Sequence, residues 1–433
     1  MRVTRRYFLR SSGAMAAYLG VAPSLALPAS VTSRAHPVTA GRTLVAIFLR
    51  GGADGLNLIV PFGDPNYAPL RKGIGISPPS SGGSLASAID LDGYFGLHPR
   101  LSPLKPMFDA GRASALHAVG YDRNTRSHFE EQDVWETGVL GNTVHSDGWL
   151  NRHLATSEGH GPLRAVAVGD TLPRILHGAA AAYAVRGLED LTLPGEASKR
   201  EGLVRALEHA YCADRGAARD GARALLDRTA GSTLEGLRQL AAVLERTPMS
   251  AHRYPDTEIG RRLGQVARLI RADVGLEVAE IDYGGWDTHQ QQGRVSDGGG
   301  TFGNLAGDLG EALAAFDADM GDRMNDVLVV TLSEFGRTAA ENGSGGTDHG
   351  WASAMLLAGG AVSRVRAKGG DAGRPVQGTW PGLAPDQLHE GRDLLHTTDF
   401  RDVLAELVRV HLGNPNLERV LPERAFRPVG VIA

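Results

Sequence analysis

Acidic and histidine side chains follow several of the most apolar segments of this 433-residue sequence. Asp54 comes after TLVAIFLR and a glycine-rich turn, and Glu334 comes after VLVVTL. Taken singly, an Asp beside a Gly is more often a turn residue than a ligand. Carboxylates and imidazoles supplied together from several strand ends suit zinc, manganese, calcium or iron. The sequence therefore predicts a divalent metal centre with six candidate ligands: Asp54, Asp287, His289, Glu334, Asp348 and His349.

A second set of reactive residues lies in NTRSHFEE, where a helix is expected to begin at Ser127. Backbone N–H groups at a helix N-terminus favour negative charge, so the Ser127 hydroxyl is a candidate nucleophile. The alternative is that Ser127 caps the helix and forms a capping box with Glu130. His128 is a candidate acid or base.

Two arginines are candidates for holding an anionic group, because a guanidinium matches its oxygens in bidentate fashion. They are Arg126, beside the candidate nucleophile, and Arg337 in SEFGRT. The alternative for each is a salt bridge that fixes a loop.

The elements that would position these residues alternate between strands and helices. Short apolar runs predict strands at 43–50, 113–119, 164–168, 276–281, 327–332 and 354–357. Helices are expected at 102–110, 127–137, 307–320 and 398–411, and Ala, Leu, Arg and Glu recur at helical spacing through 194–273. This order predicts an α/β fold, a doubly wound and mostly parallel sheet with a helical insertion at about 194–273.

The N-terminus has the pattern of a cleavable twin-arginine signal peptide. Arg5 and Arg6 precede a short Ala- and Gly-rich apolar run, and Ser24-Leu25-Ala26 offers a cleavage site. The run is too short for a stable membrane span in the mature protein. We expect a signal at 1–26, a linker at 27–42 and a single domain at 43–433, with the twin-arginine export machinery as a partner. The mature protein would be periplasmic or secreted; the alternative for the segment is a basic amphipathic helix.

Composition excludes nucleic acid as an expected partner. The net charge is −4, and removing the signal takes away four arginines and no acid, which leaves −8. No basic stripe appears, and aromatic residues make up only 6% of the chain. The single cysteine, Cys212, suits a protein that folds before it leaves the cytoplasm.

Several motifs together resemble the domain of unknown function 1501 family, whose members are exported proteins, usually with twin-arginine signals. They are FLRGGADGLNLIVP, LHPRLSPL, NTRSHFEEQDVWETG, GGWDTH, SEFGRT and NGSGGTDHG, and the likeness runs from about Thr43 to the C-terminus.

A more distant resemblance is to the alkaline phosphatase and sulfatase superfamily, an α/β fold with metals at the strand ends. It implies that Asp54, Asp287, His289 and His349 are ligands and that Ser127 is the nucleophile. It also implies an Asp-His pair after VLVVTL, where this chain has Glu334-Phe335. Because a phenyl ring cannot bind metal, the usual two-metal site is incomplete.

These observations predict an exported metal-dependent hydrolase of phosphate or sulfate esters, acting on a small anionic ester. The alternative is a non-catalytic exported binding or assembly protein that retains the fold. A third possibility is a metal-binding protein without a nucleophile, in which Ser127 only caps its helix.

Overall fold

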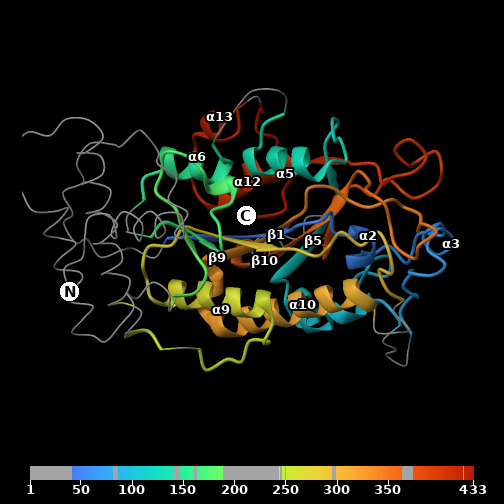
Figure 1. The fold of residues 1–433 in the computed structure, drawn as a ribbon, viewed down its shortest axis with the longest axis horizontal. Helices are drawn as coiled ribbons and strands as arrows, with labels where there is room; N and C mark the ends of the chain where they lie inside the picture. Colours follow the sequence, from blue (N-terminus) through green and yellow to red (C-terminus); the bar gives the residue numbers. More distant parts are fainter. Residues whose placement is uncertain are drawn as a thin grey trace, which may run out of the picture.

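Among the described residues, a mostly parallel sheet of nine strands forms the centre of the fold (Figure 1). The computed structural model describes residues 41–80, 86–140, 147–159, 163–188, 243, 246–248, 250–294, 299–362, 374–422 and 424–433. Across the sheet the strands are β11 (Val376–Gln377), β5 (Ala113–Gly120), β10 (Ser353–Gly359), β9 (Val327–Leu332), β1 (Thr43–Leu49), β8 (Val278–Tyr283), β6 (Ala165–Val168) and β7 (Tyr183–Val185), with β12 (Thr398–Asp399) beside β5.

The strands around β1 set the direction of the sheet. β1 is parallel to both of its neighbours, and Leu44 lies opposite Val278 of β8 and Leu328 of β9. Only β10 runs against its neighbours, β5 and β9, among the described strands of this sheet. The carboxyl ends of β9, β1 and β8 therefore meet at one edge.

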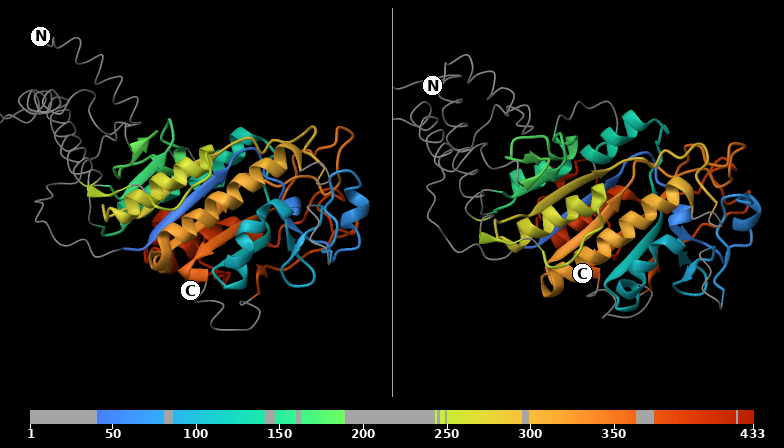
Figure 2. Two further views of the ribbon diagram at one scale, coloured as in Figure 1. Left: turned by 90° about the horizontal axis from the view of Figure 1, so that it is seen from below. Right: turned by 60° about the horizontal axis from the view of Figure 1, so that its bottom comes forward.

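Helices cover both faces of the sheet. In Figure 1 one face carries α5 (His128–Thr137), α6 (Trp149–Thr156), α12 (Phe400–Glu406) and α13 (Leu417–Val420). The other face carries α9 (Glu258–Arg271) and α10 (Gly300–Met320), which run along the sheet in Figure 2, and also the 3₁₀ helix η1 (Pro99–Leu104) and α4 (Lys105–Asp109).

Strand β1 is buried on both faces because its alternate side chains enter two different cores. Ile47 packs in the core that includes Leu263 of α9 and Phe316 of α10. Phe48 packs in the opposite core, which includes Phe400 of α12. This double burial explains the uninterrupted apolar run of the sequence.

The remaining described elements are a small sheet and several short helical segments. A small antiparallel sheet contains β2 (Ile59–Val60), β4 (Gly96–Leu97) and β3 (Ile89–Asp90). The short helical segments are α2 (Gly55–Leu58), α3 (Tyr67–Leu70), η2 (Arg174–Leu176), η5 (Gly321–Asn325) and the π-helical η7 (Leu407–His411).

The mixed α/β fold with a mostly parallel sheet confirms the prediction from sequence. The expected helix at 102–110 is divided into η1 and α4, and the helix expected at 307–320 begins earlier, at Gly300. The closing helix begins at Phe400, with the Asp399 side chain accepting a capping hydrogen bond from the Arg401 N–H.

Two predicted segments lie wholly or largely outside the described residues. Residues 1–40 contain the expected signal peptide and nearly all of the linker, and 189–242 contain most of the expected insertion. The last part of the range 194–273 forms α9, which packs on α10 and on strands β6 and β8 as a covering helix of the sheet. None of the helices within the described ranges is long and apolar enough to span a bilayer.

Candidate metal centre

The segments that follow β1, β5, β8 and β9 and the loop that precedes β10 meet at one edge of the sheet. β8 leads to Asp287, and β9 leads directly to Glu334. Because β10 is antiparallel to β9, the loop that precedes it brings His349 to the same edge. β5 leads to α5, which begins at His128 and ends at Gly138 in the left-handed conformation that favours glycine.

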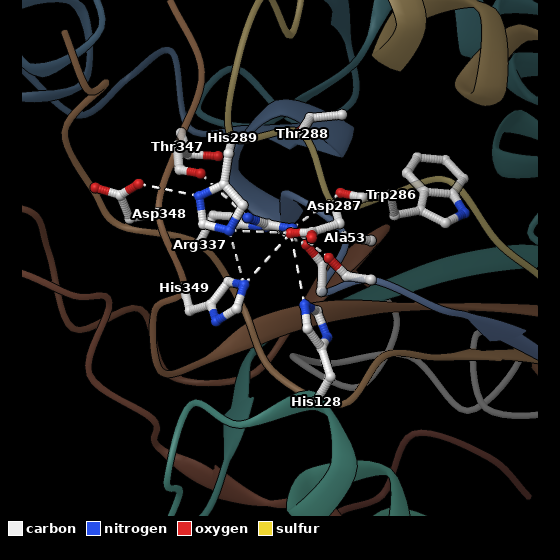
Figure 3. Close-up of polar contacts among 12 residues, drawn as sticks. Ala53, His128, Trp286, Asp287, Thr288, His289, Arg337, Thr347, Asp348 and His349 are labelled. Carbon is white, nitrogen blue, oxygen red and sulfur yellow. Dashed lines mark hydrogen bonds and ion pairs between the residues drawn. The ribbon is translucent and has the colours of Figure 1, made fainter. Parts of the chain in front are cut away.

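One carboxylate oxygen, Oδ1 of Asp287, is surrounded by three imidazoles (Figure 3). The Nε2 atom of His289 lies 3.2 Å from it, that of His349 3.3 Å and that of His128 3.5 Å. Ligand atoms of His128, Asp287 and His349 all lie within 4.8 Å of one another. These three side chains, which we call the His-Asp-His group, form a possible metal-binding site.

Each imidazole is oriented by a hydrogen bond to its other ring nitrogen. Nδ1 of His128 contacts Oε1 of Glu334 at 2.8 Å, and Nδ1 of His289 contacts Oδ1 of Asp348 at 3.0 Å. Nδ1 of His349 contacts the backbone oxygen of Arg126 at 2.8 Å.

These acceptors determine which ring nitrogen carries a proton. A carbonyl oxygen can only accept, so Nδ1 of His349 is the donor, and Nε2 of the neutral ring has a free lone pair. The same reasoning applies to His128 beside the ionised Glu334. Such acceptors behind a histidine are typical of metal-binding imidazoles.

The separations of the donor atoms fit a metal ion. For bonds of about 2.0–2.2 Å, two ligands of a tetrahedral ion lie about 3.4 Å apart. The distances from Asp287 Oδ1 to the three Nε2 atoms bracket that value. Moreover, Nε2 of His128 is buried without a hydrogen-bond partner. An unpartnered buried nitrogen is costly unless another species binds it.

The contact between His289 and His349 has the same implication. Their Nε2 atoms are 2.9 Å apart. Two lone pairs repel at this distance, so either a proton or a cation must lie between the nitrogens. A proton on either Nε2 atom, or a metal ion bound by both rings, removes this repulsion.

An apolar ring and two glycines form the wall beside this group. Phe335 is buried, and its ring centroid lies 4.8 Å from that of His128 and 4.7 Å from that of His349. A Cβ atom on Gly52 would lie 2.4 Å from the Phe335 ring, and one on Gly51 would lie 2.5 Å from the Asp287 nitrogen. Both glycines have positive φ, so this close turn requires glycine.

Arg337 is buried and connects several turns of the site through its guanidinium. Its guanidinium donates to the backbone oxygens of Gly51, Gly52, Trp286 and Thr347, and to Asp287 Oδ1 at 2.6 Å. This arrangement matches the alternative in which the arginine fixes a loop. It holds the turn after β1 against the turn after β8.

The pKa shifts reflect these contacts. Burial alone raises the pKa of the Asp287 carboxyl, but the hydrogen bond and charge of Arg337 outweigh it and lower the pKa. Burial likewise opposes ionisation of Glu334, yet hydrogen bonds from His128 and Gln132 lower its pKa. The hydrogen bond to Glu334 raises the pKa of His128, whereas burial lowers the pKa of His349. Both carboxylates are therefore ionised at neutral pH.

The structure places the predicted ligands in four different positions. Asp287 and His349 belong to the His-Asp-His group, and His289 lies beside it. Glu334 and Asp348 lie behind imidazoles as hydrogen-bond acceptors. Asp54 lies outside the group, where it accepts from Arg71 at 2.5 Å and from Gln292 at 2.6 Å.

The structure also shows the contacts of the residues around the candidate nucleophile. Ser127 is the N-cap residue of α5, but its side chain makes no capping hydrogen bond, so the capping box with Glu130 is absent. His128, expected as an acid or base, belongs to the His-Asp-His group. The Arg126 guanidinium is held by Asp393 and Glu390.

Two residues of the site were not predicted from sequence. Gln132 donates to Glu334 Oε1 at 3.0 Å, and its position one helical turn after His128 is a signal that could have identified it. Asp393 lies in a loop far along the chain, where no motif distinguishes it from other turn residues.

Fold and site together define an α/β protein with a candidate metal centre at the carboxyl edge of its sheet. The match to a family model extends over residues 41–413. The chain belongs to that family, which is described as Protein of unknown function (DUF1501). No curated protein matches it.

Proposed function

We propose that this protein is an exported metal-dependent hydrolase of phosphate or sulfate esters. One observation carries the proposal: three imidazoles, each anchored at Nδ1, direct Nε2 towards the same oxygen of Asp287. Two imidazoles and one carboxylate are also the protein ligands of known catalytic zinc sites.

The His-Asp-His group would hold the metal, with His289 as a further ligand at its edge. Imidazole donors favour zinc or iron over calcium and manganese, which suit oxygen ligands. When bound, such an ion polarises an ester oxygen and stabilises developing negative charge.

Ser127 is the proposed nucleophile. It directly precedes His128, and its hydroxyl is not used in capping α5. In the proposed reaction Ser127 Oγ forms a bond to phosphorus or sulfur while the bond to the alcohol oxygen breaks. The serine proton passes through water to the alcohol oxygen, so the alcohol leaves protonated. A second water then forms a bond to phosphorus or sulfur, the bond to Ser127 Oγ breaks, and a proton from that water returns to Oγ as phosphate or sulfate is released. The N-terminus of α5 favours the anionic group.

Neither candidate arginine is well placed to hold the substrate. Arg337 is buried and its donors bind four backbone oxygens and Asp287. Arg126 binds Asp393 and Glu390. We assign both arginines to positioning the site.

The resemblance to alkaline phosphatases and sulfatases supports ester hydrolysis and an alkaline phosphatase-like version of this α/β fold. The twin-arginine pattern at 1–26 supports export, so the reaction would take place in the periplasm or outside the cell. A folded protein would carry its metal with it through this route.

Elemental analysis of mature protein, purified without chelator, tests the proposal. We expect about one equivalent of metal in the wild type and loss of that metal in His349→Ala. His177→Ala is a matched control, because His177 is also half-buried but bonds the Leu172 carbonyl away from the site. Hydrolysis of p-nitrophenyl phosphate and sulfate should depend on the same metal.

A second candidate is a non-catalytic exported binding or assembly protein. Two observations favour it: the Asp54 carboxylate is ion-paired with Arg71, and residue 335 is a phenylalanine, which cannot bind metal. It predicts no stoichiometric metal, even after supplementation, and no ester hydrolysis.

A further inference from the structure

We propose that Asp393 is the positioning residue for His349 and that it acts through two arginines, Arg126 and Arg392. The inference rests on the metal centre of the proposed function, in which His349 is a ligand. It assigns a role to a loop, 389–393, that no sequence motif marks.

The first connection runs through Arg126. Nε and Nη2 of Arg126 donate to Oδ2 of Asp393 at 3.0 and 2.8 Å. The backbone oxygen of the same arginine accepts from Nδ1 of His349 at 2.8 Å. Fixing the Arg126 side chain therefore also restrains the carbonyl that orients the imidazole.

The conformation of Arg126 makes this restraint important. Its φ is 59°, in the left-handed region that costs a non-glycine residue about 1–2 kcal/mol. The Asn124 side chain accepts from its N–H at 2.7 Å, and its guanidinium lies 5.2 Å from the Trp351 ring centroid. If the ion pair with Asp393 is lost, only the exposed Glu390 still pairs with the guanidinium, so the backbone can relax and the carbonyl can move away from His349.

The second connection runs through Arg392. Its Nε donates to Oδ1 of Asp393 at 2.9 Å, and its Nη2 donates to the backbone oxygen of His349 at 2.5 Å. The two carboxylate oxygens of Asp393 thus each bind one arginine that contacts His349. Arg126 supplies the carbonyl that accepts from the imidazole, and Arg392 donates to the backbone oxygen of His349.

Asp393 is itself held rigidly. Its side chain is fully buried, and its backbone exchanges hydrogen bonds with His389 at 2.8 and 3.0 Å. The carbonyl of Arg392 accepts from the Ala339 N–H at 3.1 Å, which ties the loop to the segment after β9. The buried carboxylate of Asp393 therefore fixes the two arginines that position His349.

The test is metal affinity in Asp393→Asn, measured by competition with a chromophoric zinc chelator. We expect a loss of about 10- to 100-fold, as for other outer partners of metal ligands. Asp402→Asn is the matched control, because Asp402 is also a buried carboxylate paired with an arginine, Arg424, at 2.8 Å. Affinity within twofold of the wild type in folded Asp393→Asn would overturn the inference.

A second measurement does not require metal. Long-range ¹H–¹⁵N spectra of histidine-labelled apoprotein should show His349 with its proton on Nδ1, and this signature should be lost in Asp393→Asn. An unchanged tautomer in the variant would overturn the inference, whereas absence of metal from the wild type would overturn only the proposed function. If Asp393→Asn does not fold, Arg392→Gln, whose side chain is half exposed, should shift both readouts in the same direction.

Discussion

Arg71 donates to the carboxylate of Asp54 across 2.5 Å, and neither side chain is more than 1% exposed. The same guanidinium binds Asn57 and the backbone oxygens of Thr338 and Ala339. Asp54 in turn accepts from Gln292, in the segment that follows His289. The acid predicted as a metal ligand is thus the centre of a buried network that joins the turn after β1 to two loops of the site.

Asp54→Asn should separate these two roles. Removing one partner of a buried ion pair leaves the other charge uncompensated, which costs about 3–5 kcal/mol. We expect a loss of that order in the free energy of unfolding, measured in urea, with an unchanged metal content of the folded protein. Asp64→Asn is the control, because Asp64 is buried among neutral donors such as the Trp380 indole and should cost less. Loss of metal at full stability would show that Asp54 is a ligand after all.

Ser127→Ala tests the nucleophile. Because Ser127 does not cap α5 through its side chain, the variant should lose less than about 0.5 kcal/mol, below the usual cost for a capping serine. Hydrolysis should nevertheless fall by several orders of magnitude in steady-state assays. Thr257→Ala provides the comparison, since Thr257 does cap α9 through the Gly260 N–H and should lose about 1 kcal/mol. Intact hydrolysis in Ser127→Ala would rule out the covalent mechanism.

The sequence predicted the framework well where burial alone determines structure. The apolar runs of β1 and β9 are buried on both faces, so their composition identifies them directly. Gly138 marked the end of α5 because a left-handed residue is needed there. The glycine-rich start of α10 was missed, because glycine lowers helix propensity and only packing stabilises a helix at Gly300.

The sequence predicted most of the residues that gather at the candidate site, but not the contacts that each of them makes. Strand ends gathered most of the candidate residues, as the direction of the sheet required. The role of each side chain depends on contacts that form only in the folded protein. Asp54 is ion-paired with Arg71, 17 residues away, and Arg126, whose carbonyl accepts from His349, is held by Asp393, 267 residues away. Local patterns contain no information on such contacts.

Glu280 lies in a buried charge cluster that the proposed mechanism does not use. It belongs to β8, is almost fully buried and has one carboxylate oxygen without a hydrogen-bond partner. Burial, followed by the charge of Asp282, raises its pKa well above the usual value, and Arg50 opposes the shift. Arg50 also pairs with Glu136 and Asp282 at 2.5 Å each, so the cluster ties α5 to the sheet.

Glu280→Gln should therefore change how stability depends on pH. The unfolded chain releases the Glu280 proton near pH 4.5, whereas the folded protein retains it to higher pH. Wild-type stability should consequently fall as pH rises through this window, by up to about 1.4 kcal/mol per pH unit. The amide cannot ionise, so the variant should lack this decline and gain on the wild type towards pH 8. Urea unfolding between pH 4 and 8 measures the difference, with Glu418→Gln on the exposed side of α13 as the control. Parallel pH profiles for wild type and Glu280→Gln would mean that Glu280 is already ionised in the folded protein.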